Sequence, residues 1–87
     1  MANSKSAEKR NRQSIVRRDR NRAHRSRMRS AVKELRTAIA EGDAATAREL
    51  LPGTLSLVDH TAQRGVIHDN AAARTKSRLQ RQVDALS

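Results

Sequence analysis

The sequence predicts an all-α protein, a three-helix bundle whose long N-terminal helix overhangs the other two as a basic arm. Ala, Leu, Arg, Glu and Gln dominate the 87 residues, and runs of β-branched residues are absent, which favours helices. The three Gly and the one Pro all fall between residues 42 and 65, so they divide the chain into three segments. A chain of this length forms one small domain, which we place over residues 1–87.

The first helix is predicted over about residues 5–41. Its C-terminal half carries an apolar stripe with the 3.6-residue spacing of a helix face, formed by Met28, Ala31, Val32, Leu35, Ala38 and Ile39. Ile15, Val16 and Ala23 do not lie on the continuation of this stripe. Since a helix rises ~1.5 Å per residue, this one would be on the order of 50 Å long. We therefore expect its N-terminal half to project beyond the core.

The second helix is predicted over about residues 44–64. Gly42 suits the left-handed residue that ends a helix, and Asp43 follows as an N-cap for the next one. One face is apolar, with Ala47, Leu51, Leu55, Val58 and Ala62. Because Pro52 lacks a backbone donor and clashes with the preceding turn, we expect a kink or a brief break over residues 51–53.

The third helix is predicted over about residues 69–86, after Gly65 ends the second. Its apolar face is formed by Ala72, Leu79, Val83 and Leu86. Val66 and Ile67 are apolar residues in the connecting segment, and we expect both to pack into the core. Three helices joined by short turns predict an antiparallel bundle.

The positive charge is concentrated in the first segment. Residues 1–36 hold 13 basic and 3 acidic side chains, residues 37–69 hold 2 and 5, and residues 70–87 hold 4 and 1. The net charge of +10 is therefore the charge of the first segment, because the other two cancel. Such an excess attracts polyanions, and nucleic acid is the expected partner ahead of an anionic membrane surface.

The basic side chains are distributed nearly all round the first helix. One set recurs at steps of three or four and forms a stripe beside the apolar one: Arg18, Arg22, Arg25, Arg29, Lys33 and Arg36. Another set lies elsewhere around the helix: Arg10, Arg12, Arg17, Arg20 and Arg27. A rod that is basic on every side suits a crevice between several RNA helices. Since the chain has no aromatic residue, stacking platforms are excluded, and recognition should be of backbone and shape.

The sequence predicts no enzyme, cofactor, metal or small-molecule substrate. There is no Cys, and the three histidines, His24, His60 and His68, lack the i,i+4 spacing of a helical zinc site. His24 is instead expected beside a phosphate. No glycine-rich phosphate loop occurs. No run approaches the ~20 apolar residues of a membrane span, and no apolar stretch follows the basic N-terminus, so we expect a cytoplasmic protein.

Three alternative functions share some of these features: two kinds of DNA binding and membrane binding. Residues 21–27 resemble the basic region of a leucine-zipper protein, but Gly42 interrupts the heptads that a zipper would need. A histone-like DNA-compacting protein fits the charge as well as an RNA-binding protein does. A membrane-active helix would need large apolar residues opposite the charge, which the arm lacks. We expect no obligate homo-oligomer.

Three stretches carry a resemblance to a known family. The opening Met1–Arg10, the pair Gly42-Asp43 and the segment 65–79 together resemble the S-twenty family of bacterial small-subunit ribosomal proteins, in the right order and over essentially the whole chain. The resemblance implies a three-helix structural protein that binds directly to small-subunit ribosomal RNA during assembly. It implies other ribosomal components as partners, and a first helix inserted among RNA helices.

Two groups of residues match the RNA-contacting motifs of that family by position. The N-terminal group is Asn3, Lys5, Ser6, Lys9 and Arg10. The second group is His68, Asn70, Ala73, Arg74, Lys76 and Arg78. Within it, His68 and Asn70 are expected to cap the helix or form hydrogen bonds. Asp69 and Ala71 stand where basic or polar residues would be expected, so the third helix could touch less RNA here.

Overall fold

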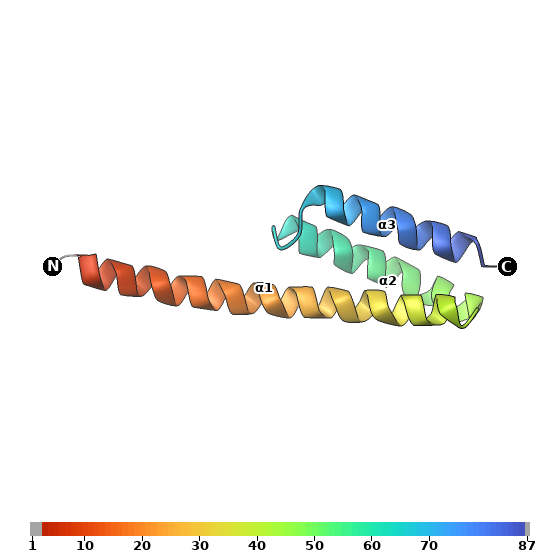
Figure 1. Ribbon diagram of the computed structural model, residues 1–87, viewed down its shortest axis with the longest axis horizontal. Coiled ribbons are helices and arrows are strands. Elements are labelled where there is room, and N and C mark those ends of the chain that lie inside the picture. Colours follow the sequence, from red (N-terminus) through yellow and green to blue (C-terminus); the bar gives the residue numbers. More distant parts are fainter. Residues whose placement is uncertain (1–2, 87) are drawn as a thin grey trace.

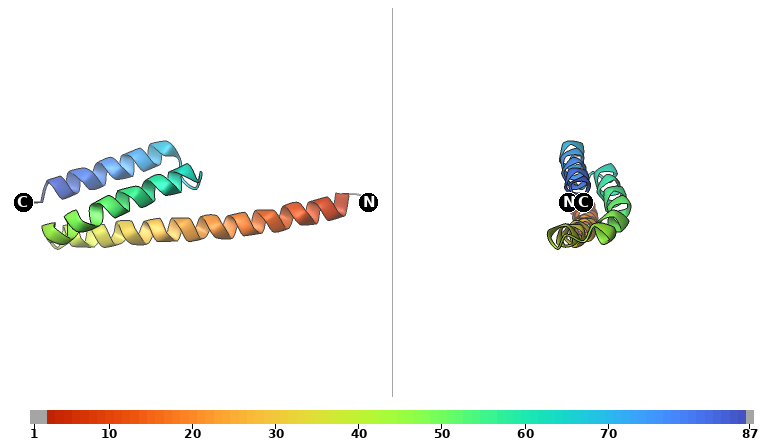
Figure 2. Two further views of the ribbon diagram at one scale, coloured as in Figure 1. Left: turned by 180° about the vertical axis from the view of Figure 1, so that it is seen from behind. Right: turned by 90° about the vertical axis from the view of Figure 1, so that its right-hand side faces the viewer.

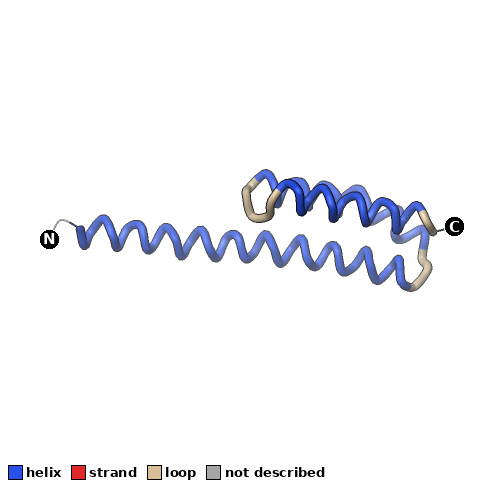
Figure 3. Tube along the Cα trace, turned by 45° about the horizontal axis from the view of Figure 1, so that its top comes forward, coloured by secondary structure: helices blue, strands red, loops and turns tan. Residues whose placement is uncertain are grey.

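The computed structural model describes residues 3–86, which form three helices joined by two short loops (Figures 1 and 3). They are α1 (Asn3–Ala40), α2 (Ala44–Gln63) and α3 (Asp69–Asp84). Helices α2 and α3 lie along the C-terminal half of α1, and the N-terminal half of α1 extends past both (Figure 1). The molecule is therefore elongated, with extents of 67 × 20 × 15 Å. The predicted all-α bundle with an overhanging N-terminal helix is confirmed.

Helix α2 is the central element of the bundle. It runs antiparallel to both neighbours, and the view along the long axis shows the three helices at the corners of a triangle (Figure 2). Contacts are extensive between α1 and α2 and between α2 and α3, whereas α1 and α3 touch at few positions. The side of the bundle between α1 and α3 is consequently the open one.

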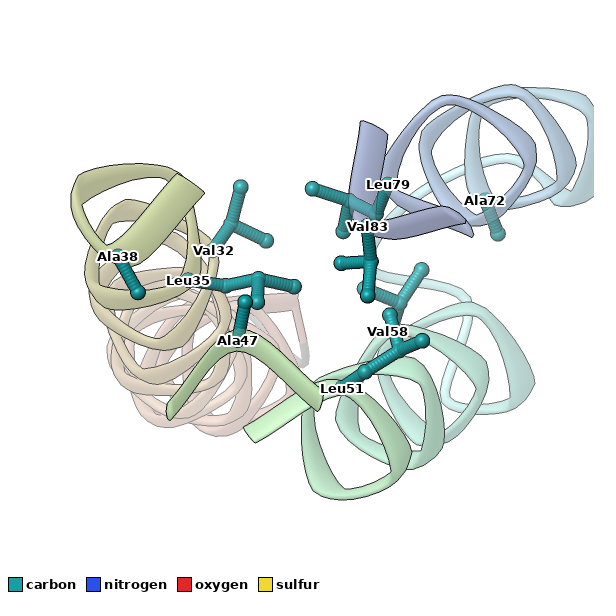
Figure 4. Close-up of a cluster of buried hydrophobic side chains, with 9 residues drawn as sticks. All are labelled: Val32, Leu35, Ala38, Ala47, Leu51, Val58, Ala72, Leu79 and Val83. Atoms are coloured by element: carbon teal, nitrogen blue, oxygen red, sulfur yellow. The ribbon is translucent and has the colours of Figure 1, made fainter. Parts of the chain in front are cut away.

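The core is a single cluster contributed by all three helices (Figure 4). Its buried members are Val32, Leu35, Ala38, Ala47, Leu51, Val58, Ala72, Leu79 and Val83. Met28, Ile39, Leu55, Ala62, Ile67 and Leu86 are half-buried against it. The predicted apolar faces are thus confirmed. Ile15 and Val16 are 47% and 53% exposed, in agreement with an arm that lies outside the core.

Two polar residues of the core were not predicted from the sequence. Thr54 and Thr61 are buried on the inner face of α2. Each hydroxyl donates to the carbonyl oxygen four residues earlier, Thr54 to Leu50 at 2.9 Å and Thr61 to Leu57 at 2.7 Å. The hydroxyl is thereby satisfied within its own helix, so the methyl group can pack inward at little cost. Their spacing of seven residues, on the apolar face, was the available signal.

Both turns of the bundle have the same construction. Gly42 has φ +70°, its N–H donates to Ile39, and the N–H of Asp43 donates to Ala38 at 2.9 Å. Gly65 has φ +75°, with equivalent bonds from Gly65 to Ala62 and from Val66 to Thr61. This pattern is the Schellman motif. It needs one residue in the left-handed conformation, which Gly adopts without strain.

Asp43 caps α2 as predicted. Its carboxylate accepts from the backbone N–H of Thr46 at 3.2 Å and from the Thr46 hydroxyl at 2.6 Å. The hydroxyl bond, followed by the backbone bond, lowers the pKa of Asp43 below its ordinary value. The charged carboxylate is therefore favoured by the folded state.

Replacing Asp43 with alanine is expected to lower the thermal midpoint at pH 7, because two hydrogen bonds at the start of α2 are lost. Since folding lowers the Asp43 pKa, this contribution is complete above the unfolded-state value near 3.8 and disappears as the pH falls through the folded-state value. Thermal melts followed by circular dichroism should show the two proteins converging in acid. Equal midpoints at pH 7 would contradict the cap. Asp84→Ala, which removes an exposed carboxylate near the end of α3, is the control.

Two sequence-based expectations about helix boundaries are corrected. The brief break expected at residues 51–53 does not occur, because α2 continues through Pro52 as one helix. The other expectation, a kink at Pro52, stays a prediction. Pro52 lies on the exposed face, while Leu51 and Thr54 are buried on the inner face. Packing on the inner face outweighs the loss of one backbone hydrogen bond on the outer face. Helix α3 ends at Asp84 rather than residue 86, and Leu86 packs on the core from beyond the helix.

Candidate nucleic-acid interface

The part of α1 that leaves the bundle has no covered face. Every side chain from Lys5 to Arg20 is exposed. This stretch includes seven of the predicted RNA-binding cations, namely Lys5, Lys9, Arg10, Arg12, Arg17, Arg18 and Arg20, together with Ser6. Arg22, Arg25 and Arg27 are also exposed. Asn3 begins α1, and its side chain lies outside the described residues.

Within residues 3–86, the cations of the arm form no ion pair with the protein itself. The only ion pair among the described residues joins Lys76 of α3 to Asp59 of α2, at 2.8 Å. Glu8 and Asp19 are the two carboxylates between residues 3 and 27, against ten basic side chains. The arm is thus a helical rod of uncompensated positive charge, which an external polyanion could neutralise from several sides.

The basic stripe of α1 continues from the arm onto the open side of the bundle. There Arg29, Lys33 and Arg36 line a groove of about 460 Å³ between α1 and α3. Apolar atoms of Met28 and Val32 also line it, and Thr75 borders it from α3. Arg78 follows Thr75 by three residues and therefore lies on the same side of α3. The cations that line the groove all come from α1, and a phosphate backbone lying in it would face them.

The predicted residues at the start of α3 have different environments. His68 is the N-cap, and its Nδ1 accepts the backbone N–H of Asn70 at 3.0 Å, as expected for a capping role. Arg74 and Arg78 are exposed and free to meet a ligand. The ammonium of Lys76 is bound to Asp59, so this residue ties α3 to α2 as the protein stands.

The structure does not bring the two predicted motifs together. The stretch from Lys5 to Arg10 lies near the tip of the arm, whereas α3 begins beside the point where the arm leaves the bundle (Figure 1). From Lys5 to His24 the helix rises roughly 28 Å at 1.5 Å per residue. The interface is therefore extended, and a ligand that touches both motifs must itself be large.

The structure does bring His24 next to a residue that the sequence analysis did not single out. A pocket of about 390 Å³ is lined by His24, Arg17, Arg20 and Asn21 of α1 and by Arg64 and Gly65 at the end of α2. Partial burial, followed by the positive charges of Arg64, Arg27 and Arg20, lowers the pKa of His24. Arg64 lies in the acidic middle segment, where charge counting gave no reason to select it.

The described residues contain neither a cluster of metal ligands nor a membrane-spanning helix. Within residues 3–86, no three or more His, Asp or Glu side chains gather as a metal site would require. No helix of that range has the length and apolar character needed to cross a membrane.

Comparison with known proteins decides the family. The family model described as ribosomal protein S20 matches residues 2–84. The chain belongs to the ribosomal protein S20 family. Among its relatives is the small ribosomal subunit protein bS20 of Koribacter versatilis, 53% identical, over 98% of this chain and 96% of the relative.

Other members of the ribosomal protein S20 family match over the same extent. The bS20 protein of Syntrophobacter fumaroxidans is 50% identical over 99% of this chain and 100% of its own length. That of Bordetella avium is 48% identical over the full length of both chains. The family resemblance seen in the sequence is confirmed. The family is one of structural ribosomal proteins, in agreement with the expectation that the chain is not an enzyme.

Proposed function

We propose that this ribosomal protein binds directly to small-subunit ribosomal RNA and helps to assemble and stabilise the small subunit. In this proposal residues 1–87 act as one RNA-binding domain in the cytoplasm, in a single copy and with other ribosomal components as neighbours. The observation that carries it is the arm, in which every side chain from Lys5 to Arg20 is exposed and residues 3–27 hold ten basic and two acidic side chains.

The distribution of charge supports a binding site within folded RNA rather than on a single duplex. A helix that lies on one duplex needs charge on the side that faces it, whereas the arm carries Arg12, Arg18 and Arg20 at widely different angles around its axis. Phosphates could therefore approach from several directions, as they would in a crevice between RNA helices. The absence of aromatic residues further supports recognition of backbone and shape.

The bundle supplies a second part of the proposed interface. Arg29, Lys33 and Arg36 border the α1–α3 groove, and Arg74 and Arg78 are exposed on α3. His68 contributes by capping α3, because its Nδ1 accepts the backbone N–H of Asn70. Asn70, which is exposed, is proposed as a direct hydrogen-bonding contact. Lys76 would bind RNA either beside Asp59, since its ammonium has three N–H donors, or by exchanging Asp59 for a phosphate. The remaining RNA contacts that we propose are those predicted on α1.

A DNA-binding function of the leucine-zipper type is disfavoured by the packing. In a zipper the apolar stripe of α1 would face a second copy of the same helix. Here Val32, Leu35 and Ala38 are buried within the bundle of their own chain. A histone-like DNA-binding function can be distinguished from RNA binding by an assay in which DNA competes with ribosomal RNA for the protein.

The expected result is tight, strongly salt-dependent binding to small-subunit ribosomal RNA. If ~8 phosphates are neutralised, the logarithm of the association constant should fall with the logarithm of salt concentration at a slope of about −6 to −7. Filter binding from 0.05 to 0.4 M potassium chloride measures this slope, and duplex DNA of random sequence serves as competitor. A slope near zero, or equal displacement by DNA and RNA, would overturn the proposal.

A further inference from the structure

The pocket at the junction of arm and bundle concentrates positive charge from two helices. Arg17 and Arg20 come from α1 and Arg64 from the end of α2, with Asn21 and His24 between them. No acidic side chain lines this pocket, and every charge that shifts the pKa of His24 is an arginine. Like charges held together without a counter-ion oppose folding, so an anion that enters the pocket would relieve their repulsion.

The backbone of Arg64 is held in place by the turn that ends α2. Its backbone N–H donates to His60 at 3.1 Å, and the next two N–H groups complete the Schellman motif at Gly65. That motif ends on Thr61, which is only 2% exposed. The opposing residues stand on the continuous helix α1. The backbone on both sides of the pocket is thus positioned before any ligand arrives, which reduces the backbone entropy lost on binding.

We propose that this junction pocket binds one phosphodiester group of the ribosomal RNA backbone. Arg64 and Arg20 hold its anionic oxygens from two different helices, Asn21 donates an amide hydrogen, and His24 donates after taking up a proton. A guanidinium presents several N–H donors in a plane that matches phosphate, which suits Arg to this role. The proposal deepens the RNA-binding function above and rests on it.

The first test compares Arg64→Ala with Arg81→Ala in binding to full small-subunit ribosomal RNA. Both variants lose one positive charge from an exposed arginine, but Arg81 lies in the last turn of α3, outside the pocket, and donates to Ser77. Arg64→Ala is expected to make the salt slope shallower by about 0.7–0.9, the value for one lost phosphate contact. Arg81→Ala should leave the slope unchanged.

Thermal melts of both variants establish that each remains folded. Equal slopes for the two variants would overturn the junction site while leaving the general function intact. Failure of the wild-type protein to bind the RNA would instead overturn the proposed function itself.

The second test follows the protonation of His24 by nuclear magnetic resonance. Burial, followed by the charges of Arg64 at the end of α2 and of Arg27 and Arg20 on α1, keeps the pKa of His24 below its ordinary value in the free protein. A bound phosphate reverses this field, so the His24 pKa should rise when ribosomal RNA is added, and binding should tighten as the pH falls from 8 to 6. His24→Gln assigns the resonance and should abolish this component of the pH dependence. An unchanged His24 pKa in the complex would overturn the site.

Discussion

Removing four arginines from one face of α1 is expected to weaken binding to small-subunit ribosomal RNA by roughly 10²–10³-fold at 0.15 M salt. The four are Arg18, Arg22, Arg25 and Arg29, each replaced with alanine. All four side chains are exposed, and none belongs to the core. If each contacts one phosphate, the salt slope should become shallower by about 3. Filter binding against salt concentration gives both quantities.

The fold should survive this change. Alanine has the highest helix propensity, and removing like charges at i,i+4 spacing relieves repulsion along the arm. The helical signal in circular dichroism should therefore be kept or increased. Loss of binding in this variant then reports on lost contacts and not on unfolding.

The matched control replaces the same four arginines with lysine. This variant keeps the charge, so its salt slope should remain that of the wild type. Any loss of affinity in it measures the planar guanidinium fork separately from charge. Wild-type affinity in the alanine variant would contradict the assignment of this stripe to the RNA interface.

Replacing Leu35 with alanine is expected to produce a large loss of stability. Leu35 is fully buried, and its side chain points from α1 toward the space between α2 and α3 (Figure 4). A buried Leu→Ala change costs about 2–5 kcal/mol, through lost transfer free energy and the cavity left behind. In a chain of this size each kcal/mol lowers the thermal midpoint by about 4–8 °C, so a fall of at least about 8 °C is expected.

Ile15→Ala is the matched control for this second prediction. It removes a comparable apolar side chain from the arm, where Ile15 is 47% exposed. Surface substitutions usually change stability by less than about 0.5 kcal/mol, so its midpoint should stay close to that of the wild type. Thermal melts at 222 nm suit a protein without aromatic residues. Equal midpoints for the two variants would contradict the position of the core.

Most of the bundle could be predicted because its signals are local. The Gly42-Asp43 pair specifies the end of one helix and the start of the next within a few residues. The spacing of Val32, Leu35 and Ala38 specifies a buried face in the same way. Pro52 shows the limit of such reasoning. Its local cost predicted a kink or a brief break, whereas packing on the opposite face of α2 keeps the helix continuous.

The proposed RNA interface likewise contains features that follow from local sequence and features that depend on tertiary packing. The basic arm follows from composition and periodicity, because an isolated helix displays its residues in an order that the sequence alone specifies. The capping role of His68 is local and was also predictable. The ion pair between Lys76 and Asp59 was not, since it depends on the register in which α3 packs against α2.

Helices, caps and a cationic arm were determined by the amino-acid sequence, because each depends on residues within one or two helical turns of one another. The open α1–α3 groove and the junction pocket were decided only by the tertiary structure. His24 and Arg64 lie far apart in the chain and in segments of opposite net charge, so no local pattern relates them. They meet because α2 packs back along α1 and ends where the arm leaves the bundle.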